Sequence, residues 1–295
     1  MNNLEPRLVK HVDYPIEGEN YAPTIIHLEG GAAIYAYADF ISIGYGTKLS
    51  PKLRIGFLDK PVERFVTGDH CRLFGGTIAS RNFVCGDYVT IHDNVWAYGR
   101  DDILIGHNSW FGMRCTLDAE GGFSVGNGFG AGQDTHLWSH IRHGDVMEGC
   151  RYLSFGKFIA HDDVWFVGRC TSGPAEHMSK SIALTESNVT RGMAENSVYG
   201  GNPAVILNEK IGKPYDEVSL ARKQMMFQGY MEKFLLKYPH HYPSLAKEEK
   251  LFERFDIKTR TYKKMNTPLE VAFMRFLLPE VKFVPKNYPV VRLEP

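Results

Sequence analysis

The sequence lacks the marks of several protein classes. It contains no run of about 18 apolar residues, so we expect no membrane-spanning helix. Its N-terminus, MNNLEPRLVKHVDYP, has no apolar stretch that would predict a secretory signal. The five cysteines are odd in number and none forms a CxxC pair, which argues against a disulfide framework or a zinc knuckle. We therefore expect a cytoplasmic protein with free thiols.

An excess of charge of one sign is also absent, because the formal net charge is zero. Phosphate binding usually requires a basic surface, so we expect no nucleic-acid partner. Hydrophobic residues make up 43% of the 295 residues, which is enough to build a buried core. The length suits one large domain or two smaller ones.

What the sequence does contain is a six-residue repeat, from about residue 41 to residue 139. One apolar side chain per hexad would fill a triangular coil, and the small residue that follows would stand where the chain turns. Three hexads, about 18 residues, make one coil, and stacked coils pair their backbones. An antiparallel sandwich is the alternative, but its strands would alternate with a period of two. The apolar positions of the clearest hexads are Ile105, Phe111, Leu117 and Phe123, then Val125, Ala131 and Leu137.

Interruptions of the repeat divide the chain. Residues 57–65, 97–103 and 140–158 do not fit the hexads, and in a solenoid such insertions leave the coil as surface loops. The third is the longest, and loops of that length are often functional. We predict a lead-in segment over 1–40, a β-helix domain over 41–207 that carries the loop 140–158, and a helical extension over 208–295.

The extension changes character, with less glycine and more Lys, Glu, Met and Phe. Leu220, Phe227, Met231 and Phe234 recur at helical spacing. Thr267–Glu270 combines a capping box with a proline at the first helical position, which predicts a second helix that Pro279 stops.

Three segments resemble the hexapeptide-repeat acyltransferase family, nearest to its sugar and xenobiotic acetyltransferases. They are VGNGFGAGQDTHLWSH at 125–140, IAHDDVWFVG at 159–168 and AENSVYGGNPAVI at 194–206, the last resembling the family's closing coil. The resemblance implies a left-handed parallel β-helix, a homotrimer, and acetyl-CoA bound in a cleft between neighbouring subunits.

Acetyl transfer to a hydroxyl or amine requires a base, and histidine suits this role because it titrates near neutrality. The family's catalytic histidine follows an aromatic residue at the end of a coil, which favours His140 after Trp138, then His143, then His136. All three could instead be structural or surface histidines. A third group usually orients the base, and Asp134, Asp145 and Glu148 remain open for that role.

The resemblance also implies a cofactor and an acceptor site. Trp165 matches a family tryptophan beside the cleft, although a core position would be equally ordinary. Small residues would let the cofactor pass close to the backbone, and basic residues could meet its phosphates, although most single Lys and Arg side chains are simply solvated. The predicted cofactor set is Trp165, Gly168, Lys180, Ser181, Ala183 and Arg191; the predicted acceptor set is Trp138, Arg114 and Asp134.

We therefore expect an acetyl-CoA-dependent O- or N-acetyltransferase that acts on a sugar, polysaccharide or nucleotide-sugar, without a metal. A xenobiotic (antibiotic) acetyltransferase is the first alternative. A metalloenzyme resembling the γ-carbonic anhydrases, with His136, His140 and His161 as ligands, is the second. A non-catalytic trimeric scaffold is the third.

Overall fold

A computed structural model describes residues 8–11, 23–28, 31–241, 251–278 and 280–286. The chain forms two compact units, Met1–Tyr215 with Val291–Pro295, and Asp216–Val290. Residues up to Tyr215 belong with the first unit because polar side chains hold them to its last coil. Asn208 accepts a hydrogen bond from Val198 N at 2.8 Å, and Asn196 exchanges two hydrogen bonds with the Tyr215 backbone.

The first unit is built from three sheets whose strands are almost all parallel. The first sheet contains β4 (Ala38–Ile43), β7 (Val62–Thr67), β10 (Asn82–Cys85), β13 (Ile103–Ile105), β16 (Phe123–Val125), β21 (Phe158–Ala160) and β24 (Glu176–His177), with β1 (Leu8–His11) antiparallel to β4. The second contains β5 (Lys48–Leu49), β8 (Arg72–Leu73), β11 (Thr90–Ile91), β14 (Trp110–Phe111), β17 (Gly130–Ala131), β22 (Trp165–Phe166), β25 (Ile182–Ala183) and β27 (Val198–Gly200), with β28 (Val205–Ile206) antiparallel to β27. The third contains β3 (Ala33–Ala36), β6 (Leu53–Ile55), β9 (Gly76–Ala79), β12 (Val95–Tyr98), β15 (Thr116–Asp118), β18 (His136–Leu137), β23 (Thr171–Ser172) and β26 (Asn188–Val189), with β2 (Thr24–His27) antiparallel to β3.

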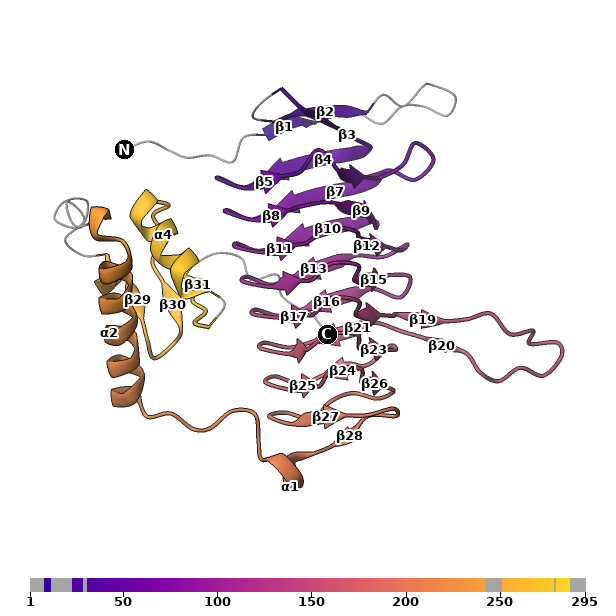
Figure 1. Ribbon diagram of the computed structural model, residues 1–295. Helices are drawn as coiled ribbons and strands as arrows, with labels where there is room; N and C mark the ends of the chain where they lie inside the picture. Colours follow the sequence, from indigo (N-terminus) through magenta and orange to yellow (C-terminus); the bar gives the residue numbers. More distant parts are fainter. Residues whose placement is uncertain (1–7, 12–22, 29–30, 242–250, 279, 287–295) are drawn as a thin grey trace. The chain divides into compact units, whose positions relative to one another are not determined.

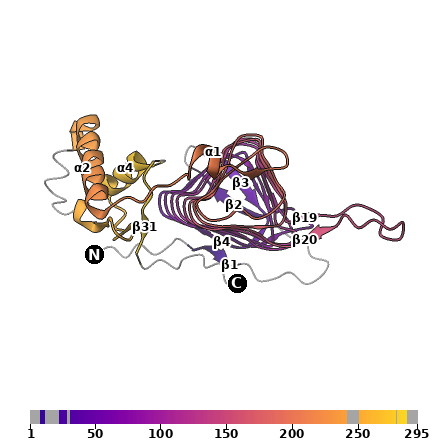
Figure 2. The same cartoon turned by 90° about the horizontal axis from the view of Figure 1, so that it is seen from below.

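The chain winds through the sheets in a fixed order. It passes from the first sheet to the second, then to the third, and returns to the first one strand further along. Figures 1 and 2 together show that this winding is left-handed and that the cross-section is triangular. The expected left-handed parallel β-helix is therefore confirmed.

The hexad positions form the interior of the coil. The seven apolar residues that defined the repeat, Ile105, Phe111, Leu117, Phe123, Val125, Ala131 and Leu137, are all fully buried. Their flanking residues point outward, because side chains alternate along a strand.

The glycines that follow the hexad positions are required by close packing between coils, and not by the turn that was predicted. A Cβ on Gly106 would lie 2.4 Å from the backbone of Gly126 in the next coil, so the position requires close approach between coils. The positive φ angles fall two residues further on, at Asn108 with φ 60° and Arg114 with φ 59°. At each corner, the glycine allows the neighbouring coil to approach closely, and the residue two positions later adopts the positive φ of the turn.

Coil length changes where the repeat was predicted to break. Arg72 pairs with Thr90, and Thr90 pairs with Trp110, so successive coils lengthen from 18 to 20 residues. One extra residue lies within 92–94, at the corner between the second and the third sheet, and the other within 99–102, at the corner between the third and the first. The predicted break over 57–65 is correct only in part, because residues from Val62 onward form β7.

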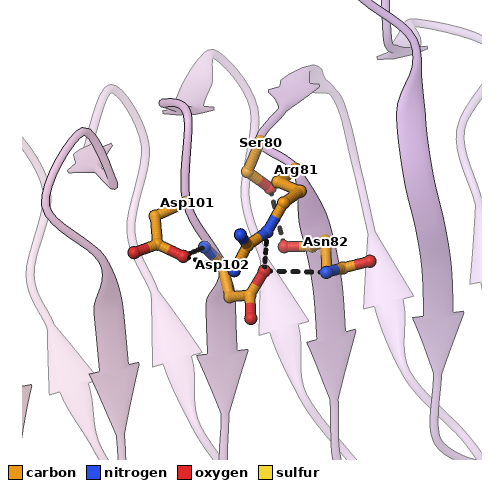
Figure 3. A network of polar contacts seen from close by, with 5 residues as sticks. All are labelled: Ser80, Arg81, Asn82, Asp101 and Asp102. Atoms are coloured by element: carbon orange, nitrogen blue, oxygen red, sulfur yellow. Dashed lines mark hydrogen bonds and ion pairs between the residues drawn. The ribbon is translucent and has the colours of Figure 1, made fainter.

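Ion pairs stabilise this lengthened corner, as Figure 3 shows. Arg81 binds Asp101 at 2.6 Å and Asp102 at 2.9 Å, and Asn82 donates to the same Asp102 oxygen at 2.7 Å. The contacts join neighbouring coils. One guanidinium thus serves two carboxylates, and these contacts fix the backbone that leads to the next corner.

The predicted loop 140–158 is an excursion that projects from the coil (Figures 1 and 2), although its last residue, Phe158, is fully buried and begins β21. Its base is a short antiparallel pair, β19 (His140–Ile141) and β20 (Ser154–Phe155). Large apolar side chains on it face solvent, including Met147, which is 96% exposed, and Tyr152, which is 79% exposed. Such exposure on a projecting segment is typical of a surface that contacts another molecule.

The second unit combines helices with a small sheet. It contains α2 (Leu220–Lys237), α4 (Pro268–Leu277), two 3-10 turns (Pro239–His241 and Phe252–Arg254), and a sheet of β29 (Phe255–Asp256), β30 (Thr261–Tyr262) and β31 (Val284–Pro285); α1 (Asn208–Ile211) precedes it.

The predicted capping box is confirmed, because Thr267 Oγ1 accepts a hydrogen bond from Glu270 N at 3.3 Å. Phe227 and Phe234 are buried as their spacing predicted, whereas Leu220 is 44% exposed. The sheet was not predicted, and Pro279 lies outside the described residues. Among the described residues, no helix combines the length and the apolar content that a membrane span requires.

Candidate active site

A histidine–aspartate pair lies where the excursion leaves the coil. His140 Nδ1 is 2.6 Å from Asp118 Oδ2. Asp118 ends β15 and is fully buried, whereas the His140 side chain is 29% exposed. The carboxylate occupies the Nδ1 side of the ring, which leaves Nε2 as the nitrogen that can take a proton.

Backbone groups fix the Asp118 carboxylate. Oδ2 also accepts hydrogen bonds from Ser139 N at 3.0 Å and His140 N at 3.2 Å, and Oδ1 accepts one from Glu120 N at 3.0 Å. Four donors therefore converge on one buried carboxylate, which satisfies its negative charge without a neighbouring Lys or Arg. This arrangement holds the His140 ring in one orientation relative to the coil.

Neither of the other candidate bases has this geometry. His136 lies on β18, where its Nδ1 is 2.9 Å from Thr116 Oγ1, a neutral partner. His143 is exposed on the excursion. The pairing with a buried carboxylate distinguishes His140 from both.

Asp118, which contacts His140, is not among the acids that the sequence suggested as orienting groups. Of the three acids considered, Asp134 is bound to Arg114, and the exposed Asp145 accepts a hydrogen bond from Met147 N at 2.8 Å within the excursion. Glu148 is exposed there too. Leu117 pairs with Leu137 one coil on, so counting hexads across coils would have brought Asp118 beside Trp138 and next to His140.

The predicted acceptor residues occupy two places. Trp138 is half-buried, two residues before His140, with its ring 6.3 Å from that of His136. Arg114 and Asp134 lie at the opposite edge of the third sheet, where two hydrogen bonds of 2.7 and 2.8 Å join them. The hydrogen bond from Arg114 lowers the pKa of Asp134, and the same bond raises the pKa of Arg114. Both groups therefore stay charged. They form a corner ion pair and do not lie next to His140.

The predicted cofactor residues lie on the second sheet and its corners, except Arg191, which follows β26 of the third sheet. Trp165 is 44% exposed on the outer face of β22, and its ring lies over Gly130, where an added Cβ would come within 2.9 Å of Trp165 Cδ1. Lys180 Nζ lies 5.9 Å from the Tyr215 ring centre. Arg191 is exposed.

The remaining three cofactor positions offer backbone only. Ser181 and Ala183 are buried, and Ser181 Oγ donates to Met178 O at 2.7 Å, so neither side chain faces a ligand. Gly168 is buried at the corner that follows β22. The cofactor set other than Arg191 thus lies away from the corner that carries His140, whereas Arg191 follows β26 at that same corner, two coils further on.

The proposed metal ligands of the metalloenzyme alternative have separate partners. His161 Nε2 is 2.7 Å from Glu176 Oε1, whereas His136 and His140 contact Thr116 and Asp118. Within the part of the chain that the structure describes, no three His, Cys, Asp or Glu side chains gather to hold a metal ion. All five cysteines have free thiols.

Comparisons with known proteins give structural matches only. No known protein-family profile matches the sequence, and no curated protein sequence matches it. Among solved structures, the polySia-specific acetyltransferase NeuO matches with a TM-score of 0.48 and 18% identity over 61% of this chain and 85% of its own. AntD, an N-acyltransferase from Bacillus cereus, matches with a TM-score of 0.34 and 15% identity over 68% and 90%. A maltose O-acetyltransferase from Clostridium difficile matches with a TM-score of 0.30 and 15% identity over 52% and 70%.

All three of these proteins are named as acyltransferases. The fold itself is established by the strand pairing described above.

Proposed function

We propose that this protein is an acetyl-CoA-dependent acetyltransferase whose general base is His140. The observation that carries the proposal is the 2.6 Å contact between His140 Nδ1 and the buried Asp118. A histidine that lacks a catalytic role has little need of a fully buried carboxylate held by three backbone N–H groups. The position also matches the family's catalytic histidine in the segment that ends at residue 140.

The residues support direct transfer. His140 Nε2 takes the proton of an acceptor hydroxyl or amine as the acceptor oxygen or nitrogen attacks the thioester carbonyl carbon. The carbon–sulfur bond then breaks, and the proton passes to the departing thiolate to give free CoA. Asp118 stabilises the imidazolium that exists between these two steps and keeps the ring in place.

A homotrimer with acetyl-CoA between subunits is part of the proposal. Trp165 lies on the second sheet and Lys180 at its corner with the first, away from the corner that carries His140, so one copy does not bring them to its own base. A cleft between two copies would do so. The exposed apolar side chains of the excursion, which begins at His140, provide a surface for a neighbouring copy.

The acceptor class that we propose is a sugar, a polysaccharide or a nucleotide-sugar. Trp138 beside the base offers a flat apolar surface of the kind that packs against a sugar ring. An antibiotic acceptor is the alternative, and a direct assay with both kinds of acceptor distinguishes them.

The test is a panel of acceptors incubated with acetyl-CoA and the full-length protein, with free thiol release as the readout. We expect release with at least one hydroxyl or amine acceptor. His140→Ala should reduce turnover at least about 100-fold, whereas His143→Ala and His136→Ala, the matched controls, should retain most of it. Acetyl-CoA binding by calorimetry should be unchanged in His140→Ala. Absence of acetyl-CoA binding to the wild-type protein would refute the enzyme assignment.

A further inference from the structure

The zero net charge of the chain hides two units of opposite sign. Asp216–Val290 contains 14 Lys and Arg residues against 9 Asp and Glu, whereas the rest of the chain contains 20 against 25. The second unit therefore has a net charge of +5 and the remainder −5. A net charge of this size attracts partners of the opposite sign, so the second unit favours anionic partners although the chain as a whole does not.

One face of α2 belongs to the core of this unit. Phe227 and Phe234 are buried on it. The Phe227 ring centroid lies 5.6 Å from that of Phe255, and the Phe234 centroid lies 5.1 Å from that of Phe273. The helix therefore meets the core of its unit through a face centred on these two phenylalanines.

The opposite face of α2 also carries apolar side chains, and these are exposed. Met225 lies two residues before Phe227 and Leu236 two residues after Phe234, and two residues correspond to about 200° of helical rotation. Met225 is 73% exposed, Leu236 79% and Met226 50%. The residues that share an arc of about 120° on this side are here called the outer face of α2: Arg222, Met225, Met226, Gly229, Lys233, Leu236 and Lys237.

The charges of the outer face are all positive. It contains Arg222, Lys233 and Lys237 and no Asp or Glu. Lys233 Nζ lies 5.4 Å from the centre of the Tyr230 ring, and Lys237 Nζ lies 5.8 Å from that of the Phe276 ring. Within the described part of the chain, none of the three cations has a carboxylate partner. Their charge is therefore open to an anionic partner.

Exposed apolar side chains among cations suit the surface of an anionic bilayer. The apolar side chains of a surface helix enter the boundary between lipid headgroups and acyl chains, while the long stems of Lys and Arg let their charges reach the lipid phosphates. A soluble polyanion such as a nucleic acid would leave Met225 and Leu236 in water, and an apolar protein groove would leave the three cations without partners. Methionine suits a fluid surface in particular, because its side chain is flexible.

We propose that the outer face of α2 binds the surface of a membrane that contains anionic lipids. The helix lies along this surface, with Met225, Met226 and Leu236 inserted and the cations at the level of the headgroups. The net charge of +5 on the second unit adds attraction to the same surface. This binding requires no membrane-spanning helix and does not depend on the proposed acetyltransferase function.

Flotation of the full-length protein with lipid vesicles tests the proposal. Vesicles of phosphatidylcholine alone are compared with vesicles that also contain phosphatidylglycerol. We expect the protein to float only with the second kind. Binding should weaken as the salt concentration rises from about 0.1 M to about 1 M, because the Debye length then falls from about 10 Å to about 3 Å. No binding to the anionic vesicles, or equal binding to both kinds, would refute the proposal.

Substitutions on the outer face test its two contributions separately. Lys233→Gln should weaken binding to the anionic vesicles about fivefold, because one Lys near such a surface contributes about 1 kcal/mol. Leu236→Gln should weaken it about fivefold as well, because it removes an inserted apolar side chain. The matched controls make the same changes in the first unit, at the exposed Lys52 and at Leu58, which is 60% exposed. Lys52→Gln and Leu58→Gln should bind like the wild type, and losses as large as those of the α2 variants would exclude the outer face.

Sedimentation without lipid distinguishes a membrane from a second copy of the chain as the partner. Leu236→Gln should keep the oligomeric state of the wild type. A smaller assembly in this variant would mean that another copy covers the outer face, and it would overturn the proposal. Flotation records binding alone, so its result stands whether or not the protein transfers acetyl groups.

Discussion

Asp118→Asn is the change that most sharply probes the proposed base. The amide has the shape of the carboxylate, but one of its two ends donates hydrogen bonds where the acid accepts them. Oδ2 accepts from three donors, the His140 ring and the Ser139 and His140 backbones, whereas Oδ1 accepts only from Glu120 N. The NH₂ group will therefore turn toward Glu120, because that orientation loses one hydrogen bond and not three.

Two magnitudes follow from this orientation. The NH₂ group faces a backbone N–H in a fully buried site, which should lower the free energy of unfolding by about 1–3 kcal/mol. His140 keeps an acceptor at Nδ1 but loses the negative charge that stabilises the imidazolium during transfer. General acid–base catalysis contributes about 10²–10⁴-fold, so we expect kcat to fall by about 10²-fold with little change in the KM for acetyl-CoA.

The assay is steady-state thiol release, with unfolding by urea measured on the same preparations. Asp101→Asn is the matched control: it makes the same chemical change at a half-exposed carboxylate one coil away, where the partner is Arg81. That variant should retain wild-type kcat. A kcat of Asp118→Asn within threefold of wild type, in folded protein, would contradict the role that we assign to the pair.

Three further predictions concern other parts of the chain. Trp165→Ala should raise the KM for acetyl-CoA about five- to tenfold, measured by thiol release at saturating acceptor, because it removes a large aromatic surface; an unchanged KM would exclude Trp165 from the cofactor site. Burial lowers the pKa of His177 from 6.5 to about 3, so the unfolded chain binds a proton near pH 6 that the folded chain does not. The free energy of unfolding should consequently fall by about 1.4 kcal/mol per pH unit from pH 6 to pH 4, and urea titrations of His177→Leu should lack that part of the slope. Glu270→Ala should destabilise the second unit by about 2–4 kcal/mol by calorimetry, because Arg254 and two backbone N–H groups lose a buried acceptor, whereas the exposed Glu253→Ala should not.

The coil could be predicted from the sequence because its rule is local. Each hexad position, such as Leu117 or Leu137, is buried by the same geometry, so one side chain in six reports the interior. The capping box at Thr267 was predictable for the same reason, since its partners lie three residues apart. The sheet of the second unit was not, because β30 pairs with β31 across more than twenty residues and its strands are only two residues long.

Only those residues of the candidate site that are marked by their position along the chain could be predicted from the sequence. His140 could be selected from its place at the end of a coil and from the family's segment. Asp118 could not be selected by nearness in sequence, because it reaches His140 through the stacking of coils, 22 residues earlier.

The structure argues against placing Arg114 and Asp134 in the acceptor site. Both have positive φ and stand at a corner, where two short hydrogen bonds join them to each other. A charge that is already paired in this way gains little from a ligand. The sequence offered no sign of this pairing, because the two residues are separated by a full coil.

The most direct test of the central claim is a side-by-side measurement of acetyl transfer by wild type and His140→Ala, with acetyl-CoA binding measured by calorimetry on both. We predict thiol release that depends on an acceptor in the wild type, a loss of at least about 100-fold in the variant, and the same acetyl-CoA affinity in each. Equal turnover in the two proteins, with intact binding, would show that His140 is not the base.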